Sequence, residues 1–417
     1  MHICIFQTGE PLHIDKGNYR PMRCMLLANK LIEKGHKVSL ISSTFFHQRK
    51  IFRFKSYRFI NVNKNLNIYL IPSIGYKNHI GIRRILDHIS LAFNLHIFLK
   101  NNKDFHPDRI FLGYPPIETS LVIILWGMKK KIPIILDVKD NWPENFIEVF
   151  PKRLKSVAKL FLFPYFFSAK YIFKESYKIT SITDSFIRWI KIISEENLDS
   201  YKVKNKYFVS PLVRKPIKLN NEVYECSKKF WLNLNINIFE QKHFSFIGSL
   251  TKSFDFNLIY FAAKYLLSRK PEYKFIVCGS GDQRDNLEKL FFNLENIILV
   301  GEIDQYQSKL LISNSIATLA PYKNNSNFNN SIPNKIIESL ENKVPFITNN
   351  YGEMKTMINN QMNGIYVPNY TNKSLSILIK LIDDKKFLNE LKENAYKTYE
   401  NLYDFDKVFE NIIKNFD

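Results

Sequence analysis

The sequence has few cysteines, and they are not arranged as a metal or redox site. The four cysteines are Cys4, Cys24, Cys226 and Cys278, and no two of them have CxxC spacing. Cys4 and Cys278 lie within apolar, strand-like runs, where cysteine behaves as a small hydrophobic residue. This pattern argues against a disulfide framework and a zinc site, and it favours a reducing compartment.

Long hydrophobic runs, a leader segment and several common motifs are also missing. The longest apolar run, LFLFPYFFSA at 160–169, is much shorter than the ~20 residues that a membrane-spanning helix needs. The amino terminus enters a strand-like run, HICIFQ, without a basic leader, so we expect no signal peptide and a cytoplasmic protein. GxGxxG, GxSxG and Walker-type loops and clusters of metal ligands are absent, so neither a cofactor nor a metal is expected.

Negative charge is scarce relative to positive charge. The chain has 60 Lys and Arg against 39 Asp and Glu, which gives a net charge of +21. Nucleic acid, an anionic membrane face and phosphorylated substrates fit such a charge, and a solvated lysine-rich surface is the alternative. The lysines are spread along the chain without a dominant stripe or a recognition motif, which argues against nucleic acid.

Short apolar strands alternate with longer amphipathic segments along almost the whole chain. Near-continuous runs such as DRIFLGY, IPIILDV and YKFIVC are typical of parallel sheets that are covered on both faces. A proline-rich, polar segment at 209–223 interrupts the series and predicts an interdomain linker. The sequence therefore predicts an α/β protein with two doubly wound, Rossmann-like domains, with functional residues just after strands and facing a central cleft.

Two strand exits in the first half carry unusual residues. Gly9 and Gly17 lie in the loop after the first strand, where glycine lets backbone N–H groups approach an anion; a plain surface loop is the alternative. After the strand that ends at Asp137 come Asp140 and Trp142. We interpret these two as part of a sugar pocket, because indole faces stack on sugar rings; helix capping by the aspartate is the alternative.

Three strand exits in the second half point to a phosphate. Gly248 and Ser249 follow a strand and Lys252 comes just before a helix, where a lysine can meet a phosphate, and Gly279 opens another helix. Plain strand-to-helix turns are the alternative for these two stretches, which do not decide the matter alone. In NSIPNKIIESLENKVPFITNN (330–350), Pro333 starts a helix on which Lys335 and Glu338 share a face. The carboxylate could accept the hydroxyls of a ribose and the cation could balance a diphosphate, whereas a surface ion pair is the alternative.

The segment at 151–178 alternates basic residues with aromatic clusters at roughly helical spacing. It is interpreted either as a helix at an anionic membrane surface or as a helix that packs its phenylalanine face on the sheet.

With these motifs in view, the chain resembles the family 4 glycosyltransferases of GT-B architecture, in the branch that builds bacterial surface polysaccharides such as O-antigen and capsule. The likeness covers nearly the whole chain. It rests on the order of its motifs: the glycine loop with its GHKV strand, DVKDNWPE, FIGSLTKSFDFNLI, FIVCGSGDQRD, NIILVGEI and PNKIIESLENKVPFI.

The resemblance implies an acceptor-binding domain at 1–212, a nucleotide-sugar domain at 213–398, and a terminal helix at 399–417 that returns to the first domain. It implies a retaining transfer without a metal, from a UDP-sugar to a lipid-linked or oligosaccharide acceptor, by a cytoplasmic enzyme peripheral to the membrane. Glu338 would bind the ribose, Lys252 and Lys335 would flank the diphosphate, and Asp140 would be the catalytic residue.

The chain departs from this family at three positions that affect the donor. Asn330 stands where many members have a second glutamate, Ser249 stands where an arginine is usual, and Ser253 stands where a glycine is usual. A non-hydrolysing UDP-sugar epimerase of the same architecture is a second interpretation of the motifs, and a basic nucleic-acid-binding protein is a third.

Overall fold

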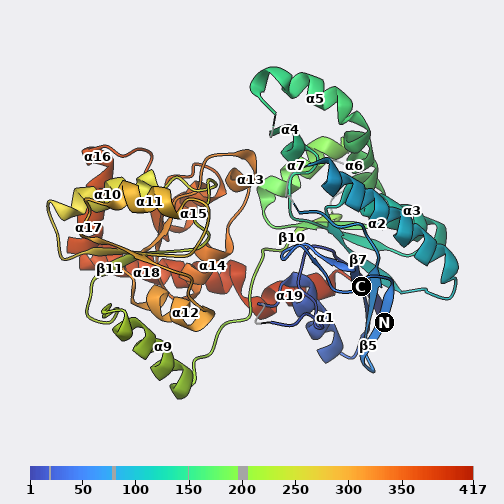
Figure 1. The fold of residues 1–417 in the computed structure, drawn as a ribbon, viewed down its shortest axis with the longest axis horizontal. Helices are drawn as coiled ribbons and strands as arrows, with labels where there is room; N and C mark the ends of the chain where they lie inside the picture. The colour runs from blue at the N-terminus through green and yellow to red at the C-terminus, as the bar shows by residue number, and fades with distance from the viewer. Residues whose placement is uncertain (18–19, 78–80, 149, 196–204, 417) are drawn as a thin grey trace. The chain divides into compact units, whose positions relative to one another are not determined.

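The computed structural model describes residues 1–17, 20–77, 81–148, 150–195 and 205–416. The chain forms two compact units (Figure 1): the first is Met1–Arg214 with Asp406–Asp417, and the second is Lys215–Phe405. Both units are mixed α/β structures built on a mainly parallel sheet, so the predicted fold class is confirmed.

The first unit is built on an eight-stranded sheet of order β10-β9-β8-β7-β1-β2-β6-β5. Strands β3 and β4 form a separate two-stranded sheet. Its strands are β1 (His2–Phe6), β2 (Lys37–Ser43), β3 (Phe45–Phe46), β4 (Ile51–Phe52), β5 (Arg58–Asn63), β6 (Leu66–Ile71), β7 (Arg109–Tyr114), β8 (Ile134–Val138), β9 (Lys178–Ser181) and β10 (Tyr207–Val209). Neighbours in the large sheet pair in parallel except β5 with β6. The buried runs of β1, β7 and β8 are what the sequence predicts for strands that are covered on both faces.

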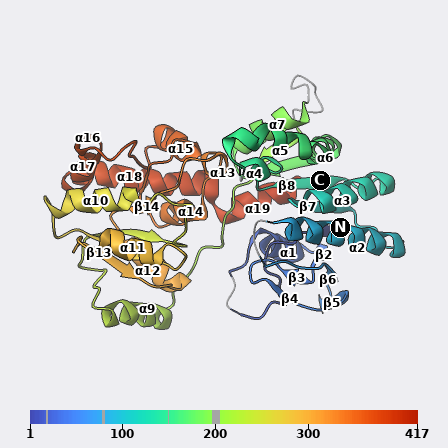
Figure 2. The same ribbon diagram turned by 45° about the horizontal axis from the view of Figure 1, so that its top comes forward.

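Helices follow most strands of the first unit. They are α1 (Arg23–Glu33), α2 (Ile82–Asn101), α3 (Ile117–Lys130), α4 (Glu144–Glu148), η1 (Lys152–Leu154), α5 (Lys155–Phe161), α6 (Phe163–Glu175), α7 (Asp184–Ser194) and α19 (Phe405–Lys414). Figure 2 shows α2 and α3 side by side, and the two helices contact each other along their length. No helix in the described part of the chain is long and apolar enough to cross a membrane.

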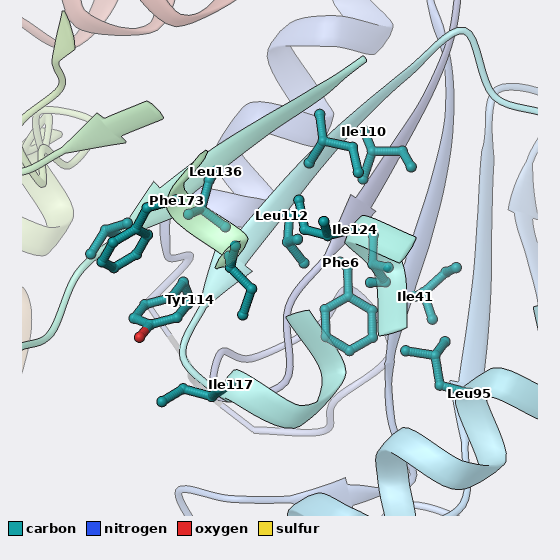
Figure 3. Close-up of a cluster of buried hydrophobic side chains, with 14 of the residues drawn as sticks. Phe6, Ile41, Leu95, Ile110, Leu112, Tyr114, Ile117, Ile124, Leu136 and Phe173 are labelled. Carbon is teal, nitrogen blue, oxygen red and sulfur yellow. The ribbon is translucent and has the colours of Figure 1, made fainter. Parts of the chain in front are cut away.

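The core of the first unit lies between this sheet and α2, α3 and α6. Ile110, Leu112 and Tyr114 alternate along β7 and point to one face, because side chains two apart in a strand share a face. Phe6 on β1 and Leu136 on β8 extend the same layer across the neighbouring strands (Figure 3). The hydroxyl of Tyr114 leaves this layer and donates a hydrogen bond to the Trp142 carbonyl at 2.7 Å. This bond ties the loop after β8 to the core.

The carboxyl-terminal helix, α19, completes the first unit although its sequence follows the second. The Arg109 Nε donates to the Phe416 carbonyl at 2.8 Å, and the Lys178 Nζ donates to the Asn415 carbonyl at 3.1 Å. These bonds cap the last carbonyl groups of the helix and fasten it to β7 and β9.

The second unit is a six-stranded sheet of order β13-β12-β11-β14-β15-β16, in which every named pair is parallel. Its strands are β11 (His243–Ile247), β12 (Lys274–Cys278), β13 (Ile297–Val300), β14 (Thr318–Ala320), β15 (Phe346–Thr348) and β16 (Gly364–Tyr366). Its helices are α9 (Asn221–Asn233), α10 (Asn257–Leu267), α11 (Arg284–Phe291), α12 (Gln305–Asn314), α13 (Ser326–Asn329), α14 (Asn334–Glu341), α15 (Glu353–Gln361), α16 (Asn372–Leu375), α17 (Ile377–Asp383), α18 (Lys385–Thr398) and η2 (Tyr399–Tyr403).

Two segments differ from the sequence-based expectation. The linker expected at 209–223 is irregular only over 210–220, because the Asn220 side chain accepts from the Val223 N–H at 2.8 Å and starts α9. The single helix expected within 151–178 is divided at Leu162 into α5 and α6. Pro164 in the first turn of α6 explains the break, since proline fits the start of a helix but not its interior.

Candidate active site

The turns after β11 and β12 press against each other at the carboxyl edge of the second sheet. Gly248 and Gly279 have φ angles of +155° and +142°, a region that favours glycine. The Gly248 N–H donates to the Cys278 carbonyl at 2.9 Å. A Cβ atom built on Gly279 would lie 1.9 Å from the Gly248 oxygen. Both positions therefore require glycine, because a side chain at either one would collide with the Lys335 amine or with the neighbouring turn.

Lys335 reaches the same edge from α14. A Cβ atom built on Gly248 would lie 1.8 Å from the Lys335 Nζ, so the ammonium group lies directly against the glycine backbone. The Nζ lies 4.2 Å from the ring centroid of Phe254, 4.5 Å from that of Phe246 and 5.7 Å from that of Tyr322. It is buried and has no hydrogen-bond partner among the residues that the structure describes. We call Phe246, Phe254, Tyr322 and Lys335 the lysine cage.

Burial dominates the electrostatics of the lysine cage. Loss of hydration lowers the pKa of Lys335 to about 7, and attraction to the Glu338 carboxylate opposes this shift only in part. Burial and the same carboxylate raise the pKa of Tyr322. The alternative of an exposed surface ion pair between Lys335 and Glu338 is therefore wrong. A buried amine that lacks a hydrogen-bond acceptor is suited to bind an anion. The negative charge of the anion would raise the pKa of the amine and favour its protonated form.

The remaining predicted residues of the second unit are less closely joined. Ser249 and Lys252 are exposed on the loop after β11, and Lys252 makes no hydrogen bond or ion pair with any described residue. Glu338 is half-buried one turn after Lys335 on α14, and Asn330 follows the short helix α13. The structure thus brings together Gly248, Gly279 and Lys335, and it leaves Ser249 and Lys252 in solvent beside them.

A buried ion network supports the loop after β8 in the first unit. The Arg23 Nη1 lies 2.5 Å from the Asp137 Oδ1, with both side chains almost fully buried. Lys139 lies 3.2 Å from the other Asp137 oxygen and forms a second ion pair with Glu10. Arg23 also donates to the Ser210 and Pro211 carbonyls. Asp137 is therefore a structural residue that fixes β8 to α1, and Glu10 and Lys139 continue the network toward a cavity.

That cavity, which we call the polar pocket, has a volume of about 340 Å³. Its lining includes Gly9, Glu10, His47, Tyr76, Arg84, Asp87, His88, Lys139 and Asp140. Burial raises the pKa of Asp140, and the positive charges of Lys139 and Arg84 oppose this shift. Burial lowers the pKa of His88 to about 3, so its 3.7 Å approach to Glu118 is not an ion pair at neutral pH. The pocket thus presents carboxylates, the cations of Arg84 and Lys139, and neutral polar groups, a mixture that suits the hydroxyl groups of a sugar.

A second cavity of about 720 Å³ adjoins the polar pocket, and we call it the apolar groove. Arg84, His88 and Asp140 line both cavities. The rest of the groove is mainly apolar, with Ile82 from α2 and Phe161 from α5 in its walls. The two cavities therefore adjoin at these three residues, the first with a polar lining and the second with a mainly apolar one.

The predicted residues of the first unit take different places on this surface. Asp140 lies at the junction of the two cavities and Gly9 lines the polar pocket. Trp142 is only 5% exposed and lines the apolar groove, with its ring 4.3 Å from that of Phe146 and 5.7 Å from that of His88. Gly17 is exposed and has a φ of +124°, and it lines neither cavity.

The basic aromatic segment at 151–178 is accounted for only in part by packing on the sheet. Ala169, Ile172 and Phe173 on α6 are buried in the core, as expected for packing on the sheet. In contrast, Phe161 is 77% exposed and Phe163 is 64% exposed. Only the second part of the segment is therefore accounted for by packing.

Several residues of the site were not found from the sequence. The aromatic members of the lysine cage come from β11, the loop after it and the residue pair after β14, and no local motif connects them. Arg84 and His88 are one helical turn apart on α2, a spacing that fits an ordinary amphipathic helix equally well. Lys139 gave the clearest signal, because it stands between Asp137 and Asp140 in DVKDN.

Known proteins match the chain in part of its sequence and in its fold. Residues 235–398 match the family model described as Glycosyl transferases group 1. No curated protein sequence matches the chain. Sucrose-phosphate synthase from Thermosynechococcus elongatus has the same fold, with a TM-score of 0.63 and 12% identity over 100% of this chain and 98% of that protein.

Two further solved structures resemble the chain along its length. WaaG, a glycosyltransferase involved in lipopolysaccharide biosynthesis, has a TM-score of 0.57 and 14% identity, and the match covers 98% of each chain. Anabaena HepE in complex with UDP-glucose has a TM-score of 0.59 and 10% identity, and the match covers 100% of this chain and 99% of that one. At such identities these likenesses establish the fold, which is GT-B.

The matched family segment lies within the second unit and includes the whole lysine cage. The predicted resemblance is therefore confirmed as far as the enzyme class and the architecture. With a group 1 glycosyltransferase domain at 235–398 and a GT-B fold, the chain is a glycosyltransferase.

Proposed function

We propose that this glycosyltransferase is a retaining, family 4 enzyme that moves a sugar from a UDP-sugar to a lipid-linked or polysaccharide acceptor during synthesis of a cell-surface glycan such as O-antigen or capsule. The observation that carries the proposal is the lysine cage: a buried amine held against the glycine turn after β11, inside the segment that matches group 1 glycosyltransferases. The UDP-glucose bound to Anabaena HepE, a protein of the same fold, supports a UDP-sugar as the donor.

The second unit would bind the donor. The backbone at Gly248 and Gly279 leaves room for the diphosphate, and Lys335 would carry a positive charge against it. Lys252, which is exposed and has a long flexible side chain, would close over the diphosphate from solvent. Glu338 would accept the two ribose hydroxyls, one helical turn from Lys335.

Two positions would adjust how the donor sugar is held. Asn330 offers both an acceptor and a donor group, so it would hydrogen-bond the sugar differently from a carboxylate, which only accepts. Ser249 supplies a hydroxyl in place of a guanidinium and leaves more of the diphosphate charge to Lys335 and to backbone N–H groups. We therefore infer that charge neutralisation depends more heavily on Lys335 in this chain.

The transfer breaks the bond between the anomeric carbon and the diphosphate oxygen, and it forms a bond from that carbon to an acceptor hydroxyl oxygen. The proton of the acceptor hydroxyl leaves with the UDP, and the anomeric configuration is retained. Lys335 would stabilise the negative charge that develops on the diphosphate, and this stabilisation would replace a metal ion. Asp140 would orient the acceptor or donor hydroxyls from the polar pocket.

The first unit would bind the acceptor at the membrane surface. On α2, Ile82, Leu86, Ile89, Phe93 and Ile97 form an exposed stripe at helical spacing, with exposed fractions from 39% to 76%. Phe163 and Phe167 on α6 add two more exposed rings. Lysines and arginines accompany these apolar side chains in 151–178, as in segments that lie on anionic lipid. We therefore propose a cytoplasmic enzyme that associates peripherally with the membrane.

A thermal-shift screen of UDP- and GDP-sugars tests the donor. A ligand present at 100 times its dissociation constant adds about 2.7 kcal/mol to the free energy of unfolding, which is readily measured. We expect UDP-sugars to stabilise the protein in the presence of EDTA. A UDP-sugar that is converted to an isomer without an acceptor would instead support the epimerase, and a preference for nucleic acid that falls steeply with salt would support a nucleic-acid-binding protein.

Two substitutions test the assigned roles. Lys252→Ala and Glu338→Ala should each abolish most sugar transfer while the unfolding temperature stays unchanged, because Lys252 is exposed and Glu338 only half-buried. Lys386→Ala and Glu390→Ala, at exposed positions on α18, are matched controls and should keep full activity. Near-normal turnover in Lys252→Ala or Glu338→Ala would remove that residue from the donor site.

A further inference from the structure

The apolar groove is not used by the donor chemistry and its surface is unusual for a protein in water. Ile82 on α2 and Phe161 on α5, both in its lining, are 76% and 77% exposed. Val157 on α5 is another wall residue and is 51% exposed. Large apolar side chains gathered at an exposed hollow mark a binding site more often than chance exposure does.

The groove adjoins the polar pocket, and this position restricts what can fill both. Arg84, His88 and Asp140 belong to the linings of both cavities. A ligand with its hydroxyl groups in the polar pocket would therefore project any attached chain past these three residues and into the groove. Such a ligand must be polar at one end and apolar along the rest.

The charge around the groove fits the same kind of ligand. From Phe150 to Lys174 the sequence contains six lysines and arginines and no aspartate or glutamate. Arg153 and Lys159 of this set are exposed and Lys155 is half-buried; all three lie on or beside α5, which also supplies Phe161 to the groove. A basic rim of this kind complements a negatively charged group at the junction of a polar head and a hydrocarbon chain, such as a phosphate.

We propose that the apolar groove binds the hydrocarbon chain of an amphiphilic acceptor whose sugar head occupies the polar pocket. The proposal rests on the proposed function and assigns the position of the acceptor's chain, on the first unit between α2 and α5. Asp140 then lies where the head joins the chain, close to the end of the sugar that carries the aglycone. The chain thus determines which end of the sugar head faces away from the groove and receives the transferred residue.

Alkyl glucosides provide a direct test, because they share one head and differ only in chain length. Binding of methyl, butyl, hexyl and octyl β-D-glucoside to the full-length protein is measured by isothermal titration calorimetry, below the concentration at which octyl glucoside forms micelles. Each methylene group that enters the groove should raise the affinity about fourfold, which corresponds to about 0.8 kcal/mol. Equal affinity for methyl and octyl glucoside would overturn the proposal.

A matched pair of variants locates the chain. Phe161→Ser removes an exposed ring from the groove wall, whereas Phe167→Ser removes a comparably exposed ring from α6 that lies outside the lining. Phe161→Ser should lower the affinity for octyl glucoside about tenfold and leave methyl glucoside binding unchanged. Phe167→Ser should change neither. An equal loss in both variants would overturn the proposal, because the chain would then lie on the outer face of the helices.

Two further measurements separate acceptor binding in the groove from dimerisation through it and from the donor chemistry. Sedimentation equilibrium tests whether a second copy of the chain fills the groove: a dimer that Phe161→Ser dissociates would overturn the proposal. UDP-glucose binding is measured on the same samples. If UDP-glucose binds but the glucosides show no dependence on chain length, the groove assignment alone fails; if the glucosides show that dependence but no UDP-sugar binds, the proposed function fails.

Discussion

Binding of UDP should be accompanied by uptake of a proton at Lys335. In the free protein, burial in the lysine cage lowers the pKa of this amine to about 7. A diphosphate that contacts the Nζ would favour the charged form and return the pKa to its ordinary range or above it. The proton gained on binding is therefore a direct report of contact between this lysine and the phosphate groups.

The size of the effect follows from the two pKa values. At about pH 8.5, an amine with a pKa of about 7 is only about 3% protonated, whereas an ordinary lysine is about 99% protonated. Each UDP molecule should therefore take up about one proton at that pH, about half a proton near pH 7 and about one tenth near pH 6. Calorimetry in two buffers that differ in ionisation enthalpy measures this number directly.

Lys335→Met is the decisive variant, since it keeps an unbranched side chain of similar length but removes the titrating group. It should weaken UDP binding and abolish the proton uptake, while Lys386→Met, at an exposed position on α18, should change neither. Tight binding of UDP to the unaltered protein at about pH 8.5 without proton uptake would refute the reasoning. Proton uptake that survives Lys335→Met would assign it to a different group.

The same shift affects the stability of the free protein. Because the folded-state pKa of Lys335 is about 7 and the unfolded-state value is the ordinary 10.5, the unfolded chain binds more protons between these two values. The contribution of Lys335 to the free energy of unfolding should therefore rise as the pH increases from about 7 toward 10.5. Urea denaturation of the free protein across this range should show the rise, and Lys335→Met should remove it.

Three further predictions concern the supports of the two sites. Gly248→Ala should destabilise the protein by about 1–3 kcal/mol in urea denaturation and abolish UDP binding, because its Cβ would overlap the Lys335 Nζ. Gly301→Ala is the control, since no atom lies within 4 Å of the added Cβ. Equal effects of the two substitutions would contradict this account. Asp137→Asn should cost about 3–5 kcal/mol, since it leaves the Arg23 charge buried without its partner; a loss below about 1 kcal/mol would show that the pair is dispensable. Asp140→Asn should reduce transfer to the acceptor while UDP binding, measured by calorimetry, stays unchanged; a parallel loss of UDP binding would place Asp140 at the donor instead.

The alternation of strands and helices, and hence the fold class, could be predicted from the sequence. A strand with one exposed face would alternate between apolar and polar residues. Runs such as IPIILDV and YKFIVC are nearly continuous in apolar residues, so these strands had to be covered on both faces. The start of α9 is a local effect that the sequence also contains, in the Asn220 cap, although the proline-rich segment before it obscured this signal. The edge strand β5 was not predicted, because its residues are mostly exposed and it pairs antiparallel with β6 at the edge of a mainly parallel sheet.

The candidate site, like the fold, could be predicted from the sequence only in part. The sequence by itself determined which residue types follow strands: glycines at 248 and 279 in the second unit and an aspartate at 140 in the first. Within each sheet, parallel strands bring their carboxyl ends to one edge. Only the tertiary structure decided that Lys335 on α14 is enclosed by Phe246, Phe254 and Tyr322, and that the polar pocket adjoins the apolar groove. The physical reason is that helix and strand periods depend on neighbours within a few residues, whereas the hydration of a charge depends on every segment that packs around it.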